Sequence, residues 1–431
     1  MTDQLPTSLP ALAQALRSGR LPLLDYLERL QAQFQQREPQ VLAFVPEPDR
    51  FIRLQREARE LLKKFPDPER GPLLFGVPLG VKDIFHVSGF VTRAGSSLPE
   101  ELLQGPEAAS VTALRNAGAL ILGKAVTTEF AYFAPGPTRN PHAPAHTPGG
   151  SSSGSAAAVG AGLCPLALGT QTIGSINRPA AFCGVVGFKP SYDRISREGV
   201  IPLSPSADHV GFFVSRVAGA ALVAPLLCRN WQDTTVGKPV LGIPEGPYLA
   251  RVSAEGQAHF EAARLRLRQA GFSLKSVPTM PDFDEIYERH NLIVAAEAAQ
   301  VHADWYVDYG HLHHPKTADL IDRGSRLSPD ELQAALKGQE KLRGQLVQLM
   351  DQNGLDLWLT PSAVGPAPAG LDSTGDPVMN LPWTHAGLPT LSVPAGVNSA
   401  GLPMGLQLAA RWYDDERLIA WSAGIENALA P

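Results

Sequence analysis

The 431-residue chain contains only three cysteines, Cys164, Cys183 and Cys228. So few thiols in so long a chain do not form the disulfide framework typical of small secreted proteins, and we expect reduced, buried cysteines in a cytoplasmic protein. The first twenty residues carry an early acid and no apolar core, which is not the pattern of a signal peptide. The longest apolar stretches, near 156–170 and 217–228, are broken by Gly or Pro and are too short to span a bilayer.

Charged residues are also sparse, at 18% of the chain with a formal net charge of −5. The sequence has no basic run of the kind that binds a phosphate backbone, so direct nucleic-acid binding is not expected. It also has no internal repeat and no low-complexity linker long enough to separate domains. The lack of a repeat or linker favours a single domain over residues 1–431. The oligomeric state is open, and a homo-oligomer is possible.

Glycine and proline are plentiful instead, with 40 and 39 residues spread along the chain, which indicates many shaped loops. Apolar, strand-like runs alternate with segments of helical periodicity, which is typical of an α/β fold. We expect a core at about 70–230 and 356–431, with a helical insertion at 283–352. The main expected elements are helices within 8–35, at 48–64 and at 155–162, strands within 73–85, 163–169, 184–191 and from 356 onward, a loop at 170–179, and a strand–helix–strand unit over 238–280.

The tract "TPGGSSSGSAAAVG" at 147–160 allows several interpretations. A flexible linker fits poorly because the tract runs directly into a run of small residues suited to a packed helix. A phosphate-binding loop would need lysine where Ser155 stands. The G-x-S-x-G pattern centred on Ser152 matches a nucleophile elbow, but an elbow follows a strand, and the proline-rich segment before this tract cannot form a central one.

A fourth interpretation pairs the tract with a lysine and a second serine. Lys82 lies in an apolar, strand-like run, where burial would lower its pKa and let it act as a base toward a serine hydroxyl. Ser175 lies in "LGTQTIGSINRPAAFCG", whose small residues and successive backbone N–H groups are the ingredients of an oxyanion hole.

Together these segments resemble the amidase signature family. The resemblance covers nearly the whole chain and rests on "GVPLGVKD" (76–83), "GPTRNP" (136–141), "TPGGSSSGSAAAV" (147–159), "LGTQTIGSINRPAAFCGVVGFKPS" (168–191) and "GLPMGLQL" (401–408). It implies a single large α/β/α domain with a central mixed β-sheet covered by helices. It also implies a serine amidohydrolase that needs neither metal nor cofactor.

Carried over position by position, the resemblance makes Lys82 the catalytic base, Ser151 a relay serine after a cis peptide bond, and Ser175 the nucleophile. Two sets of residues support this triad. The implied oxyanion donors are the backbone N–H groups of Thr172, Ile173, Gly174 and Ser175, and the implied polar supports are Ser152 and Thr170.

Residues 169–177 surround the implied nucleophile, and we call them the nucleophile loop. This loop departs from the common family pattern. Gln171 stands in place of a frequent aspartate, Ile173 in place of a glycine and Asn177 in place of an arginine, while Arg178 follows one position later. We assign Gln171 and Arg178 provisionally to substrate binding. Ser153 also stands where a glycine is common. None of these departures removes a catalytic group, but together they leave the substrate class open.

The resemblance therefore predicts an amidase that cleaves a linear carboxamide in a small-molecule substrate. Two alternatives stay open: the glutaminase subunit of a tRNA-dependent amidotransferase, and a non-catalytic binding member of the family. The histidines of "HLHHP" at 311–315 could bind metal, but their i, i+2, i+3 spacing is not that of a helical zinc pair, so no metal site is predicted.

Overall fold

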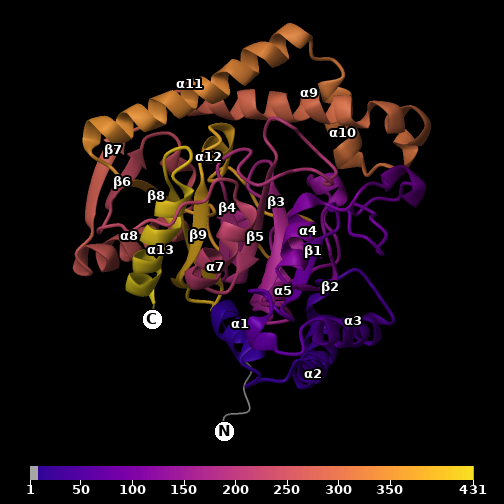
Figure 1. The fold of residues 1–431 in the computed structure, drawn as a ribbon. Coiled ribbons are helices and arrows are strands. Elements are labelled where there is room, and N and C mark those ends of the chain that lie inside the picture. The colour runs from indigo at the N-terminus through magenta and orange to yellow at the C-terminus, as the bar shows by residue number, and fades with distance from the viewer. Residues whose placement is uncertain (1–7, 431) are drawn as a thin grey trace.

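The computed structural model describes residues 8–430. Ten strands form one continuous sheet in the order β2-β1-β3-β5-β4-β9-β10-β8-β6-β7 (Figure 1). The strands are β1 (Pro78–Lys82), β2 (Leu120–Ala125), β3 (Leu166–Gln171), β4 (Val186–Lys189), β5 (His209–Val214), β6 (Val240–Glu245), β7 (Ser273–Pro278), β8 (Leu357–Pro361), β9 (Thr390–Val397) and β10 (Pro403–Ala409).

The sheet is mixed, as the resemblance implied. At one end β2, β1 and β3 pair in parallel, and at the other end β8, β6 and β7 do the same. Between these two parallel groups, the pairings from β3 through β5, β4, β9 and β10 to β8 are all antiparallel. The inner strands are buried on both faces, which explains why they are near-continuous apolar runs in the sequence.

Thirteen α-helices surround the sheet within residues 8–430. They are α1 (Leu9–Arg17), α2 (Leu23–Val41), α3 (Arg50–Lys64), α4 (Ala109–Asn116), α5 (Ser153–Gly160), α6 (Asn177–Cys183), α7 (Val217–Leu227), α8 (Ala254–Gln269), α9 (Phe283–Tyr309), α10 (Pro315–Gly324), α11 (Pro329–Asn353), α12 (Leu381–His385) and α13 (Asp415–Leu429).

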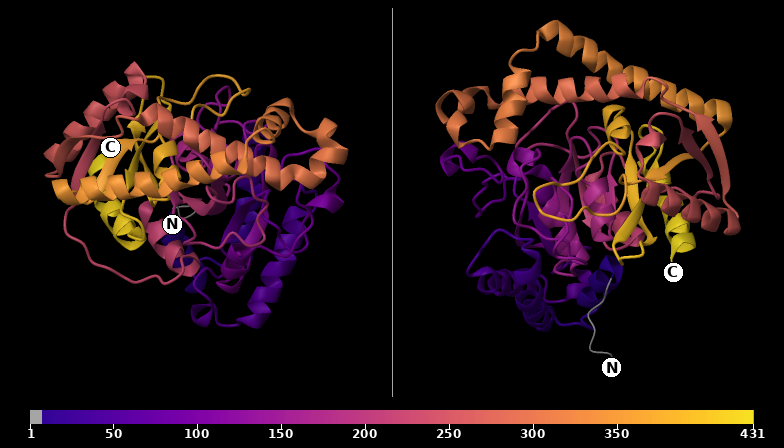
Figure 2. Two further views of the ribbon diagram at one scale, coloured as in Figure 1. Left: turned by 90° about the horizontal axis from the view of Figure 1, so that it is seen from above. Right: turned by 180° about the vertical axis from the view of Figure 1, so that it is seen from behind.

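The helices form two covering layers. On one face α5 packs on β1 and β3, and α6 packs on β4, β9 and β10; on the other, α7 packs on β5 and α13 on β9. The long helices α9 and α11 pack together and lie across the top of the sheet in Figure 1, and the view from above shows them side by side (Figure 2). The fold is therefore the single large α/β/α domain expected, and residues 283–352 are helical.

Some elements differ from the expected ones. Strand β3 extends to Gln171 and α6 begins at Asn177, so the predicted loop 170–179 is shorter than expected. Pro179 did not mark a loop because proline is tolerated in the first turn of a helix, where its missing N–H has no intrahelical partner. Strand β5 was not predicted, since its sequence alternates neither strictly nor over a long run.

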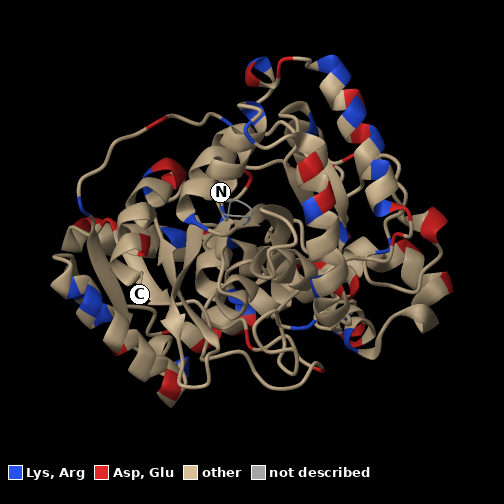
Figure 3. Cartoon of the chain, turned by 90° about the horizontal axis from the view of Figure 1, so that it is seen from below, with Lys and Arg blue, Asp and Glu red and all other residues tan. Residues whose placement is uncertain are grey.

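Charges of both signs are interspersed on the molecule. On the face seen from below, Lys and Arg alternate with Asp and Glu along the helices (Figure 3). Among residues 8–430, no helix is both long and apolar enough to cross a membrane.

Candidate active site

Lys82 ends strand β1 in the interior of the protein. The strand is flanked by β2 and β3, and all five of its residues are buried. The side chain of Lys82 is 0% exposed. Its Nζ lies 2.8 Å from the Oγ of Ser151 and 2.7 Å from the Oγ1 of Thr170. The sheet therefore holds the amine against two hydroxyl groups.

Burial changes the acid–base behaviour of this lysine. Desolvation lowers the pKa of Lys82 from 10.5 to about 7, and the negative charge of Asp208 acts in the opposite direction. Near neutral pH, an amine with this pKa is present in both its protonated and its neutral form. The neutral form can accept a proton, which an ordinary surface lysine does not do.

The loop that carries Ser151 is fixed from several sides. The Gly150–Ser151 peptide bond is cis, as the resemblance implied. The carbonyl of Ser151 accepts a 3.2 Å hydrogen bond from the backbone N–H of Thr128. The carbonyl of Gly150 accepts a 2.6 Å bond from the guanidinium of Arg178. A segment that looks like a soft glycine–serine tract is therefore buried and held in place.

Ser152 supports the neighbouring strand. Its Oγ donates to the carbonyl of Thr170 at 3.1 Å and accepts from the N–H of Thr170 at 3.2 Å. Helix α5 begins at the next residue, and no strand directly precedes the tract. This arrangement is not that of a nucleophile elbow, and a supporting role of Ser152 in the site stays a prediction.

Ser175 lies in the short connection between β3 and α6 and is 7% exposed. Side chains distant in sequence contact the carbonyls of this connection. The Thr172 carbonyl lies 3.0 Å from the Nε2 of His290, and the Ile173 carbonyl accepts a 2.7 Å bond from the Oγ1 of Thr384. The loop is therefore anchored just before Ser175.

A partly buried carboxylate anchors the same loop. The Oγ1 of Thr172 donates to the Oδ1 of Asp208 at 2.6 Å. The other carboxylate oxygen of Asp208 accepts from the backbone N–H groups of Leu203 and Ser204 at 2.9 and 3.0 Å. Burial raises the pKa of Asp208, while the hydrogen bond from Thr172 and these two backbone bonds lower it.

Gln171 is fully buried and hydrogen-bonded within the protein. Its Oε1 accepts from the N–H groups of Ile176 and Asn177 at 2.8 and 2.9 Å, and its Nε2 donates to the Oγ1 of Thr384 at 2.9 Å. These bonds tie the start of α6 to α12 across the nucleophile loop. Contact between Gln171 and a substrate stays a prediction.

Arg178 is also buried, with 1% of its surface exposed. Besides the Gly150 carbonyl, its guanidinium contacts the Oγ1 of Thr374 at 3.1 Å. Burial lowers its pKa to about 10, against the opposing effect of Asp376. Two of its nitrogens, Nε and Nη1, have no hydrogen-bond partner among the described residues. Its structural role beside the Ser151 loop is clear, and a substrate contact stays a prediction.

The structure shows what the histidines of 311–315 contact. The ring of His313 stacks on Phe130 and contacts the ring nitrogen of His302 at 3.2 Å. His314 caps the first turn of α10 through its side chain. Within residues 8–430, no group of three or more His, Cys, Asp or Glu side chains is arranged to hold a metal ion.

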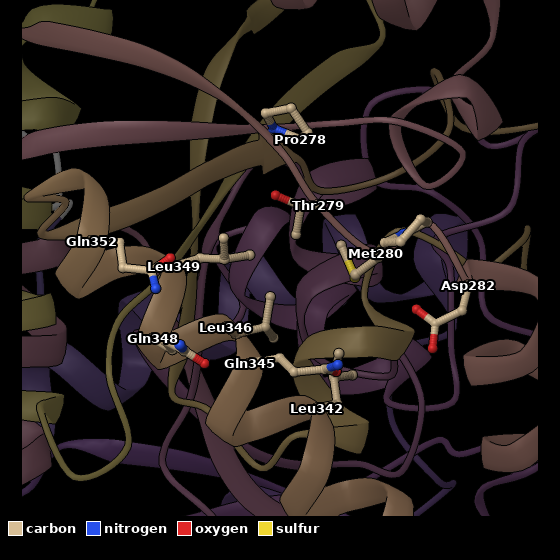
Figure 4. A pocket seen from close by; sticks show the side chains of 11 residues that line it. Pro278, Thr279, Met280, Asp282, Leu342, Gln345, Leu346, Gln348, Leu349 and Gln352 are labelled. Carbon is tan, nitrogen blue, oxygen red and sulfur yellow. The ribbon is translucent and has the colours of Figure 1, made fainter.

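A cavity of about 460 Å³ opens elsewhere, between the end of β7 and helix α11 (Figure 4). Apolar side chains such as Met280 and Leu346 form part of its wall, and three glutamines line it along the helix. None of the predicted site residues lines this cavity. It is therefore separate from the lysine–serine cluster.

The sequence and the fold are similar to those of known proteins. A family model described as Amidase matches residues 26–419. A glutamyl-tRNA(Gln) amidotransferase subunit from Koribacter versatilis (strain Ellin345) is 34% identical, and the match covers 83% of this chain and 85% of the relative. A solved structure described as an amidase is 31% identical, with a TM-score of 0.90 over 98% of this chain and 100% of the other. The peptide amidase PAM, solved with the competitive inhibitor chymostatin, is 26% identical, with a TM-score of 0.84 over 98% and 97% of the two chains.

The fold and the buried lysine–serine cluster thus define a hydrolase of the amidase type. The chain belongs to the amidase family, and it is an amidohydrolase-type enzyme.

Sequence reasoning missed the side chains that hold the nucleophile loop from outside. Asp208, His290 and Thr384 lie 36, 118 and 211 residues from the loop atoms they contact. No local pattern connects residues so far apart, and only the resemblance of whole segments could have indicated that these regions meet.

Proposed function

We propose that this enzyme hydrolyses the C–N bond of a linear carboxamide to a carboxylate and an amine or ammonia, through an acyl-enzyme on Ser175. The observation that carries the proposal is the 2.8 Å contact between the fully buried amine of Lys82 and the hydroxyl of Ser151. The lowered pKa of Lys82 supports it, because the amine is then available as a base near neutral pH.

In the acylation step, neutral Lys82 accepts the proton of Ser151, and Ser151 accepts the proton of Ser175. The Oγ of Ser175 attacks the carbonyl carbon, and the C–N bond breaks as the proton returns through Ser151 to the leaving nitrogen. A water molecule then adds to the acyl-enzyme, the ester bond breaks, and the carboxylic acid leaves while Ser175 regains its proton.

Negative charge develops on the substrate oxygen during the attack. The backbone N–H groups of Thr172, Ile173, Gly174 and Ser175 are the proposed donors to this oxyanion. Preorganised donors of this kind stabilise a transition state more than a ground state, and losing one typically costs about 10²–10³-fold in rate.

The test compares Ser175→Ala with Ser153→Ala. Ser153 is a buried serine at the start of α5 and has no role in the proposed chemistry. Ser175→Ala is expected to abolish amide hydrolysis and labelling by a fluorophosphonate probe, with its thermal midpoint preserved. Ser153→Ala is expected to keep both. Near-wild-type turnover by Ser175→Ala would refute the acyl-enzyme on Ser175.

A second candidate function comes from the names of the relatives. Two relatives with 34% and 32% identity are glutamyl-tRNA(Gln) amidotransferase subunits, one from Koribacter versatilis and one from Synechococcus sp. (strain RCC307). This function would require glutamine as the amide donor and a partner that binds tRNA. Ammonia release from free glutamine, together with co-purification of such a partner, would favour it over a stand-alone amidase. Release from a panel of aliphatic, aromatic and peptide amides by the isolated chain would favour the amidase.

A further inference from the structure

A buried histidine, supported by a second one, and a threonine contact the nucleophile loop from the C-terminal half of the chain. His290 lies on α9, and His385 ends α12; they are 0% and 1% exposed. Their rings are perpendicular, with the two Nδ1 atoms 3.3 Å apart. The opposite nitrogen of His290, Nε2, lies 3.0 Å from the carbonyl oxygen of Thr172.

The chemistry of these atoms fixes the direction of the hydrogen bond to the loop. A carbonyl oxygen only accepts, so the Nε2 of His290 must carry a proton and donate it. Burial lowers the pKa of His290 to about 4, so the ring is neutral near pH 7 and its Nδ1 is an acceptor facing His385. His385 therefore supports the orientation of His290, and His290 contacts the loop.

Thr384 makes the equivalent contact one residue further along. Its Oγ1 donates to the Ile173 carbonyl at 2.7 Å and accepts from the Nε2 of Gln171 at 2.9 Å. Thr384 is 1% exposed, so this bond is not exchanged with solvent. Two successive carbonyls of the loop are thus each held by a buried side chain.

Each of these carbonyls belongs to a planar peptide unit together with the next N–H group. Holding the carbonyl of Thr172 therefore sets the direction of the Ile173 N–H, and holding the carbonyl of Ile173 sets that of the Gly174 N–H. Both N–H groups are among the proposed oxyanion donors.

We propose that His290 and Thr384 are positioning residues that aim the oxyanion donors of Ile173 and Gly174 by clamping the carbonyl end of each peptide plane. We call this pair the carbonyl clamp. The inference rests on the proposed function, because it assigns the clamp to the oxyanion loop of that reaction. The clamp gives the helical region 283–352 a role, because α9 carries His290; the end of α12 carries Thr384.

The test uses paired substitutions that remove or keep the donor. His290→Leu and Thr384→Val remove it, whereas His290→Gln and Thr384→Ser keep an N–H or O–H group at a similar reach. For each variant, kcat, KM and the thermal midpoint are measured with one good amide substrate.

If the carbonyl clamp is correct, His290→Leu and Thr384→Val should lower kcat by about 10- to 100-fold, because misoriented N–H donors stabilise the transition state less. KM should change less than about threefold, because substrate binding is little affected. His290→Gln and Thr384→Ser are expected to recover most of the loss. A donor-free variant with wild-type kcat, or a loss equal in the donor-keeping and donor-free variants, would overturn the proposal.

A fallback pair of variants and a parallel assay separate a failure of the clamp from a failure of folding or of the proposed function. If His290→Leu does not fold, the Thr384→Val and Thr384→Ser pair decides the question alone. Ser175→Ala is assayed in parallel: full activity in that variant refutes the proposed function itself, whereas an inactive Ser175→Ala beside fully active clamp variants refutes only the clamp.

Discussion

Lys82 and Ser151 are 69 residues apart in the sequence, and their side chains meet at 2.8 Å in the interior of the protein. Lys82 lies at the end of β1, the second strand from one edge of the sheet, and Ser151 lies in a loop anchored by Arg178 and Thr128. Neither anchor depends on the amine itself. The hydroxyl is therefore presented to Lys82 by the fold, and the chemistry of the pair can be probed by changing its surroundings.

The rate is expected to depend on pH through Lys82. Below its pKa of about 7 the amine is protonated and cannot accept a proton, so kcat/KM should fall about tenfold per pH unit on the acidic side. Above that pH the amine is neutral and the rate should reach a plateau. A pH profile of kcat/KM between pH 5 and 9 checks this. An acidic limb near the pKa of an ordinary carboxylate would contradict the assignment.

Asp208→Asn should move that limb without touching the reacting groups. The charge of Asp208 raises the pKa of Lys82, so removing the charge should lower that pKa and shift the acidic limb of the profile to lower pH. The amide of asparagine can still accept from Leu203 and Ser204 and meet the hydroxyl of Thr172. A limb that stays in place or moves upward would show that Lys82 is not the titrating group.

Gln171→Leu should destabilise the fold around the nucleophile loop. It leaves the buried N–H groups of Ile176 and Asn177 without their acceptor, which costs about 1–3 kcal/mol for each group. The wild-type protein is the reference: denaturant unfolding should show a lower free energy of unfolding for the leucine variant than for the wild type. Equal values would mean that these bonds contribute little.

Gly154→Ala should destabilise the packing of α5 on the sheet. A Cβ at this position would lie 2.2 Å from the carbonyl oxygen of Ala43 and 2.4 Å from the backbone nitrogen of Val126. Because both atoms are backbone, the expected loss is about 3 kcal/mol or more, at the upper end of overpacking effects. Gly344→Ala on α11 is the control: a Cβ there meets nothing within 4 Å, so the variant should gain about 0.5–1 kcal/mol. Thermal unfolding of the two variants should shift in opposite directions.

The α/β fold class could be predicted from the sequence. So could the residues Lys82, Ser151 and Thr170, which contact one another in the structure, because each of the three lies in a recognisable segment. Buried strands are continuous apolar runs, and the segments around the three polar residues resemble a family pattern. The cis bond at Gly150–Ser151 was also expected and is present. The catalytic roles of these residues remain predictions.

The support of the loop could not be predicted in the same way. Gln171 was provisionally assigned to substrate binding, which stays a prediction. The three hydrogen bonds that its buried side chain makes to Ile176, Asn177 and Thr384 had no signal in the sequence. His290 is one of several histidines in a helical region, and nothing local separates it from the others. Which of them reaches the loop depends on how α9 crosses the sheet, which is a tertiary property.

The sheet order places β4, from the first half of the chain, beside β9 from the second. Lys82, Ser151 and Ser175 all come from the first half, whereas His290 and Thr384 come from the second. The irregular connection between α7 and β6 separates these halves and is largely exposed. A chain divided there would yield two fragments, neither of which contains both Ser175 and the carbonyl clamp. Recovery of amide hydrolysis on mixing them would make this enzyme a reporter of fragment complementation.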